Sequence, residues 1–268
     1  MSSIECIVLG LLHSGCCYGH ELDKIYKMRN MNLWTKSSRV SVYQALNRIE
    51  KKGYANVILA TGASQFEMLA ALLEEKNIDW SVVKFFHLDE YVGLPITHPA
   101  SFRLYLWQRF ICKLPVPPAA FFPVNGSAED IDAVLAELEK NITENPIDVA
   151  FVGIGENGHL AFNDPPADFD TERAYLVIDL EERCRKQQLG EGWFPTFDDV
   201  PKQAISMSVK QCMKSACIIN SVPDLRKAEA VKNALEGPVT NMCAASILQL
   251  HPDCTTFLDK DSASLLSK

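Results

Sequence analysis

The stretch 151–165, FVGIGENGHLAFNDP, carries the densest set of groups in the chain that could do acid–base chemistry. An apolar run from Ile147 to Val152 ends at a glycine-rich turn, which delivers His159 and Asp164. Histidine titrates near neutral pH, so His159 is the natural candidate for moving protons. Ligands of open α/β sheets bind beyond the carboxyl ends of the strands, where we expect this turn to lie. A tight connection around one hydrogen-bonded histidine is the plain structural alternative.

A pair of acids follows a second apolar run. Residues 82–88 predict a short buried strand, and Asp89 and Glu90 come directly after it. Carboxylates at the end of a buried strand are costly unless they are solvated, paired or used in chemistry. Capping of the next helix would account for Glu90. It accounts less well for Asp89, because the chain continues as a loop, so Asp89 is a candidate for a carboxylate that a ligand or a reaction uses.

Two other strand ends predict an anion site. A strand at 57–59 leads into a loop of small residues and then a helix, the arrangement in which backbone N–H groups and the helix dipole face a phosphate. This loop lacks the Walker ending and the three spaced glycines of dinucleotide-binding loops. The loop residues are Thr61, Gly62, Ala63 and Ser64.

The second of these strand ends offers cations. The strand 216–220 precedes a helix that we expect to begin near Asp224 and to end at Gly237, with Arg226 and Lys227 in its first turn. A cation there opposes the helix dipole at a cost of about 0.3–1 kcal/mol, which a bound anion would reverse. The alternative is that both side chains simply point into water.

Together these segments resemble the glucosamine-6-phosphate deaminase (isomerase) family from about residue 55 to the C-terminus. The resemblance is carried by ATGASQ, DEYVGLP, GENGHLAFNDP, RKAEAV and SILQLHP. The sister family of 6-phosphogluconolactonases shares a Gly-x-Gly-x-x-Gly-His segment, but AFNDP and DEYVGLP favour the deaminase. The resemblance implies an α/β fold with an open, mostly parallel, Rossmann-like sheet flanked by helices. It also implies conversion of glucosamine 6-phosphate and water to fructose 6-phosphate and ammonia, without a cofactor or metal.

The resemblance assigns roles to particular residues. Asp89 matches the base that moves a proton between C2 and C1 of the sugar, and His159 matches the residue that opens the ring. Asp164 stands where the family commonly has Glu and completes a relay with that histidine. Asn157 departs from the Asp of many members, and we expect Asp164 or Glu156 to supply the missing charge. The expected phosphate and substrate contacts are Lys227, Thr61, Gly62, Ala63, Ser64, Gln65, Gly155 and Gly158.

Residues 1–53 do not fit this family and predict a separate unit ahead of the enzyme-like domain 54–268. They resemble the front of a PadR-type winged-helix regulator, a small all-helical, helix-turn-helix-like segment whose third helix would span Val40 to Lys51. The wing is missing, so we expect no useful DNA binding and favour a plain helical cap. We predict that the third helix docks on the sheet of the enzyme-like domain.

Composition sets the remaining bounds. The chain has 268 residues, a net charge of −8 and nine scattered cysteines with no C-x-x-C pair. These features argue against general nucleic-acid binding and predict reduced thiols in a cytoplasmic protein without a membrane span or metal site. Residues 128–142 predict an amphipathic helix, and 165–200 would form a lid in the resembled family. The expected partner is a small phosphosugar. The sequence is compatible with a monomer and with a homo-oligomer.

Three functions remain at this stage. The first is the deaminase. The second is a lactonase-like phosphosugar hydrolase, which would use His159 to activate water but would not need Asp89. The third is a sugar-phosphate-responsive regulator that binds DNA through residues 1–53.

Overall fold

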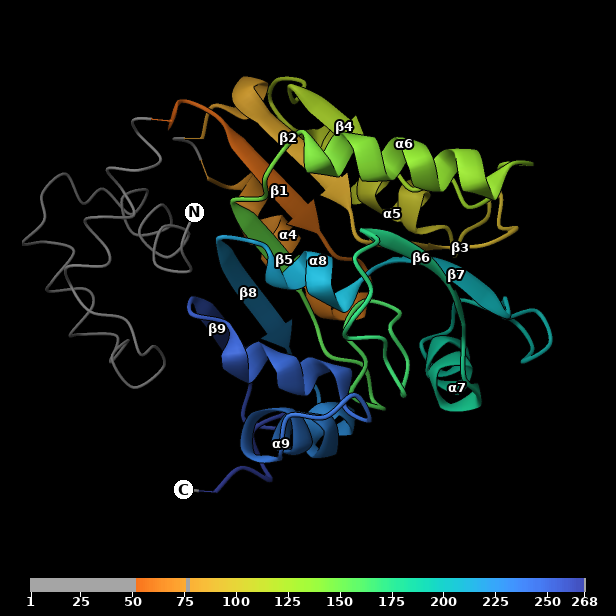
Figure 1. The fold of residues 1–268 in the computed structure, drawn as a ribbon, viewed down its shortest axis with the longest axis vertical. Coiled ribbons are helices and arrows are strands. Elements are labelled where there is room, and N and C mark those ends of the chain that lie inside the picture. The colour runs from red at the N-terminus through yellow and green to blue at the C-terminus, as the bar shows by residue number, and fades with distance from the viewer. Residues whose placement is uncertain (1–51, 76–77, 268) are drawn as a thin grey trace, which may run out of the picture.

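A six-stranded parallel sheet organises the molecule, with strand order β4-β2-β1-β5-β8-β9 (Figure 1). The structure is a computed structural model that describes residues 52–75 and 78–267. The predicted open parallel sheet is therefore confirmed. Its strands are β1 (Ala55–Leu59), β2 (Val83–His87), β4 (Ala120–Phe122), β5 (Val149–Val152), β8 (Cys217–Val222) and β9 (Cys254–Leu258).

The strand order reverses between β1 and β5. From β1 the chain builds outward through β2 to β4, and it then returns to place β5 on the other side of β1. The loops that follow β1 and β5 consequently leave the sheet in different directions. Such a switch point opens a crevice at the carboxyl ends of the strands, where ligands of this fold class bind.

A second, antiparallel sheet was not predicted. It has the order β3-β7-β6 and consists of β3 (Asp89–Tyr91), β7 (Gln203–Met207) and β6 (Tyr175–Asp179). Residues 89–91, where we expected a loop, therefore form a strand by pairing with β7. The sequence did not indicate this strand, because β7 lies more than a hundred residues further along the chain. Leu88 joins the two sheets: its N–H donates to Leu59 of β1, and its carbonyl accepts from Met207 of β7.

Helices cover both faces of the large sheet. One face carries Ile58, Phe86 and Val152 in a core shared with α6 and α9, and the other carries Val57, Phe85 and Phe151 in a core shared with α4 and α5. The predicted helix at 128–142 is confirmed as α6. The helices are α4 (Phe66–Leu73), α5 (Phe102–Arg109), α6 (Ile131–Thr143), α7 (Glu182–Gly190), α8 (Val209–Met213) and α9 (Ala228–Glu236).

The face with Val57 and Phe85 also has an apolar groove of about 390 Å³ beside α4. The helix that we expected to dock on the sheet, Val40 to Lys51, lies outside the described residues, as does nearly all of the segment 1–53. Its docking therefore stays a prediction. Over 52–75 and 78–267, no helix is both long and apolar enough to cross a membrane.

Candidate active site

A cavity of about 370 Å³ opens at the switch point, beyond the carboxyl ends of β1, β5 and β8. Eight of the residues predicted from the sequence line it: Thr61, Gly62, Ala63, Ser64, Asp89, Gly155, His159 and Lys227. The other four, Gln65, Asn157, Gly158 and Asp164, lie behind this lining and hold it in place. Segments from four separate parts of the sequence thus meet in one hollow.

The loop after β1 is fixed from below by Gln65. This side chain is fully buried, and its Nε2 donates to Ser64 Oγ (3.0 Å) and lies 3.4 and 3.3 Å from the carbonyl oxygens of Val152 and Ser221. The loop is therefore tied to the ends of β5 and β8. Gly62 has φ 93°, a conformation that favours glycine, and its carbonyl accepts from the Tyr105 hydroxyl.

Lys227 and Arg226, predicted together, have different surroundings. Arg226 pairs with Asp224 (2.7 Å) and lies 3.7 Å from Glu156, so its charge is compensated. Lys227 is buried and lines the cavity, and its ammonium has no hydrogen-bond partner in the described part of the chain. Burial lowers the pKa of Lys227, while Glu191 and Glu156 act in the opposite direction. An anion in the cavity would supply the missing partner.

Asp89 is buried at the start of β3, and one of its carboxylate oxygens has no hydrogen-bond partner among the described residues. Burial raises the pKa of Asp89 to about 8, the neighbouring Glu90 carboxylate adds to the rise, and the Thr61 side chain acts against it. A carboxyl group that titrates near neutral pH and borders a cavity is suited to take and return a proton.

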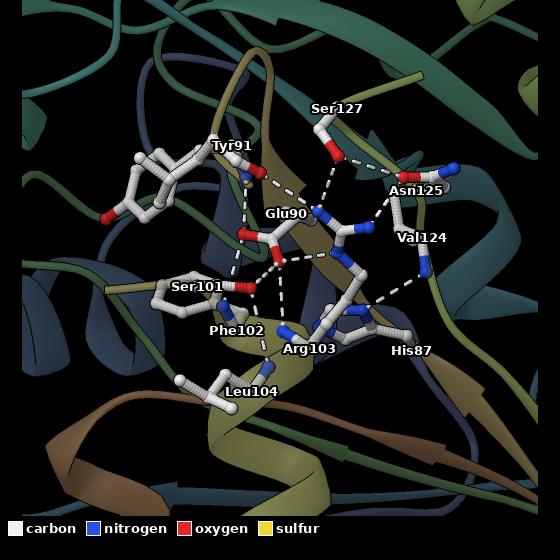
Figure 2. A network of polar contacts seen from close by, with 11 residues as sticks. His87, Glu90, Tyr91, Ser101, Phe102, Arg103, Leu104, Val124, Asn125 and Ser127 are labelled. Atoms are coloured by element: carbon white, nitrogen blue, oxygen red, sulfur yellow. Dashed lines mark hydrogen bonds and ion pairs between the residues drawn. The ribbon is translucent and has the colours of Figure 1, made fainter. Parts of the chain in front are cut away.

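Glu90 does not line the cavity, and its carboxylate is taken up by the polar network drawn in Figure 2. Its carboxylate accepts from the Ser101 hydroxyl and from the backbone N–H groups of Phe102 and Arg103, which begin α5. The Arg103 guanidinium, 3.3 Å away, also donates to Leu94 O and Asn125 Oδ1. The helix-capping interpretation of Glu90 is confirmed, and the network anchors the strand that carries Asp89.

His159 stands against Gly155 at the far end of the turn after β5. Its Nδ1 lies 3.1 Å from Asp164 Oδ1, and the backbone N–H of Gly155 donates to its carbonyl. A Cβ atom on Gly155 would lie 2.2 Å from the imidazole ring. Glycine at this position is therefore a steric requirement for the placement of the ring.

His159 and Asp164, expected to act as a relay, are in contact, and Glu181, which was not predicted, joins them through Asn157. Asn157 Nδ2 donates to Asp164 Oδ1 (2.8 Å) and to Glu181 Oε1 (2.9 Å). Glu156, our other candidate for the missing charge, turns instead to Arg226. Burial alone would raise the pKa of Asp164, but hydrogen bonds from His159, from Asn157 and from the Glu181 N–H hold it below its usual value.

The segment 165–200 contributes a wall of the cavity that the sequence did not specify. Gln187, Gln188 and Glu191, from α7 and the residue after it, all line the cavity. Tyr91 donates its hydroxyl to Gln188 Oε1, and the Glu156 N–H donates to Gln187 Oε1. The glutamine pair in QQLGEGW was the available signal, but nothing local indicated which way it would face. That this segment moves as a lid stays a prediction.

One cluster among the described residues has metal-ligand chemistry. Potential ligand atoms of His159, Asp164 and Cys184 lie within 4.8 Å of one another. Burial raises the pKa of the Cys184 thiol well above its usual value, and Asp164 adds to the rise. The cluster coincides with the relay, and the absence of a metal from the chemistry stays a prediction.

Comparison with known proteins gives consistent matches. The family model described as glucosamine-6-phosphate isomerases/6-phosphogluconolactonase matches residues 32–256. Glucosamine-6-phosphate deaminase of Listeria welshimeri is 38% identical over 236 residues, which cover 87% of this chain and 98% of that protein. A solved monomeric glucosamine-6-phosphate deaminase is 32% identical, with TM-score 0.75 over 84% of this chain and 92% of its own. The 6-phosphogluconolactonase of Thermotoga maritima, 17% identical with TM-score 0.64 over 81% and 90%, shares the fold.

The family match begins at residue 32, inside the segment 1–53, and the comparisons give no support to a winged-helix regulator there. The match spans the strand ends that form the cavity and most of the chain. This chain belongs to the family of glucosamine-6-phosphate isomerases and 6-phosphogluconolactonases.

Proposed function

We propose that the protein is a glucosamine-6-phosphate deaminase that converts glucosamine 6-phosphate and water to fructose 6-phosphate and ammonia. The observation that carries this proposal is the position of Asp89. A buried carboxyl, one of whose oxygens has no hydrogen-bond partner among the described residues, shares one cavity with His159 and with the buried Lys227. Proton transfer between two sugar carbons requires such a base, whereas opening a lactone with water does not.

Each group has one task in this reaction. The Thr61–Ser64 loop and Lys227 hold the phosphate, and His159 transfers the proton that opens the sugar ring. Asp89 then takes the proton from C2 and returns it to C1. This transfer converts the aldehyde at C1 to an alcohol and the amine at C2 to an imine, which water hydrolyses to the ketone and ammonia. Asp164 keeps the imidazole oriented through its contact with Nδ1.

Ammonia release is the direct test. Purified full-length protein should release one ammonia per fructose 6-phosphate formed from glucosamine 6-phosphate, and it should leave 6-phosphogluconolactone at its spontaneous rate of hydrolysis. Lactone hydrolysis without ammonia release would contradict the proposal and favour the lactonase. A gel shift at low salt would test the regulator, for which the described residues offer no support.

The Lys227→Ala variant should mainly raise KM for the phosphosugar. Loss of one charge-assisted hydrogen bond costs about 1.5–3 kcal/mol, which corresponds to a KM about 10- to 150-fold higher. Steady-state kinetics measure this effect, and Lys232→Ala on α9 serves as the matched control. A fall in kcat at unchanged KM would mean that Lys227 acts in the transition state instead.

The pH dependence of kcat/KM should follow Asp89. The base works as a carboxylate, and its pKa is raised to about 8, so the active fraction grows as pH rises. We expect kcat/KM to increase about tenfold per pH unit below 8 and to level off above it, since kcat/KM reports the free enzyme. A profile that is flat between pH 6 and 8 would contradict this assignment.

A further inference from the structure

The side-chain amide of Asn157 donates hydrogen bonds to two carboxylates, those of Asp164 and Glu181. Its Nδ2 lies 2.8 Å from Asp164 and 2.9 Å from Glu181, and its Oδ1 accepts from the backbone N–H of His159. The amide therefore uses both of its N–H groups and its oxygen. Only an amide can do this, because an aspartate at the same position has no N–H to donate.

Glu181 contacts both Asp164 and Asn157. Its backbone N–H, at the N-terminus of α7, donates to Asp164 Oδ2 (2.9 Å), while its side chain accepts from Asn157. Asp164 is thus held at one oxygen by Asn157 and His159 and at the other by Glu181. The closed ring of contacts leaves the carboxylate little freedom to turn away from the imidazole.

We propose that Glu181 is a positioning residue for His159, acting through Asn157 and Asp164, and that this chain requires an amide at 157 because Glu181 already supplies the second carboxylate. The inference rests on the proposed function for its kinetic consequences. An aspartate at 157 would place its own carboxylate within about 3 Å of the carboxylates of Asp164 and Glu181. Their repulsion would move the Asp164 carboxylate away from its contact with His159 Nδ1. Misplacement of a catalytic group by about 1 Å can cost about 10²-fold in rate.

The test is a set of variants whose effects should not add. Asn157→Asp should lower kcat about 10²-fold. Glu181→Gln should lower kcat several-fold. The double variant N157D/E181Q restores the original charge and an amide beside the carboxylates, so it should recover at least about tenfold of the N157D loss. A merely structural role predicts the reverse, a double variant worse than either single one.

Glu182→Gln is the matched control, since Glu182 is the next residue and its exposed carboxylate contacts only Lys186 among the described residues. It should leave kcat unchanged, and circular dichroism and thermal melting should show that all variants fold. An E181Q kcat equal to that of E182Q, or a double variant no faster than N157D, would overturn the proposal.

A spectroscopic readout keeps this test independent of turnover. The proton between His159 Nδ1 and Asp164 should give a downfield resonance in the ¹H NMR spectrum, identified by its loss in His159→Asn. We expect the resonance in the wild type and in N157D/E181Q, but not in N157D. If the wild type released no ammonia, the proposed function would fail, yet this comparison would still decide the role of Glu181. Unchanged resonances in N157D would contradict it.

Discussion

Asp89→Asn is expected to abolish isomerisation while phosphosugar binding stays nearly intact. The amide has the shape of the carboxyl group but cannot accept the C2 proton, and general-base catalysis contributes up to about 10⁴-fold in rate. The proposed phosphate contacts, the Thr61–Ser64 loop and Lys227, line the cavity and are not altered by the substitution. Ammonia release measures the loss, and isothermal calorimetry with a non-reacting phosphosugar measures the binding.

Stability provides a second readout on the same variant. In the wild type the pKa of Asp89 is raised from 3.8 to about 8, so its contribution to stability is present below pH 4 and is lost as pH rises through 8. Asp89→Asn should therefore melt at a higher temperature than the wild type at pH 8–9, with little difference near pH 4. The exposed Asp132→Asn on α6 is the control. If Asp89→Asn kept most of the wild-type turnover, Asp89 would not be the general base.

Gly155→Ala should also lower activity strongly, although it removes no chemical group. The added methyl would lie 2.2 Å from the imidazole of His159, so the ring must move away from Asp164 and from the substrate. We expect kcat to fall about 10²-fold or more, in line with the cost of displacing a catalytic group. Steady-state kinetics and the downfield imidazole proton both measure the displacement.

The control for this variant is Gly190→Ala. A Cβ atom on Gly190, at the end of α7, meets no atom within 4 Å, so the same change of residue should leave kcat unaltered. If Gly155→Ala retained full activity with a folded protein, the imidazole would have room that the structure does not show. The orientation of the ring would then not limit the rate.

The strand ends were predictable because their signals are local. Apolar runs that stop at Gly153, at Asp89 and at Thr61 indicated where strands of the parallel sheet end and which side chains lie at those ends. The partner of β3 was not predictable, since a strand of three residues has no pattern of its own and pairs with residues far along the chain.

Glu181 was missed for a related reason. In the sequence it is one of two adjacent acids in LEERCRK, and nothing separates it from the exposed Glu182 beside it. Its role depends on where α7 begins relative to Asn157, which only tertiary contacts decide. Asn157 itself was recognised as a departure, and the charge that compensates it was expected at Asp164 or Glu156; Asp164 does contact Asn157, whereas Glu181 was not considered.

The contact through Leu88 has a consequence for how this fold can diversify. The proposed phosphate site belongs to the large sheet, through the loop after β1 and the turn after β8, whereas the proposed base belongs to the small one. Leu88, bonded to both sheets, and the Tyr175 hydroxyl of β6, which donates to His87 O of β2, hold the two sheets together. On the proposed function, different sheets carry phosphate binding and proton transfer, and we expect substitutions in β3 to change the reaction of the bound sugar without weakening its phosphate contacts.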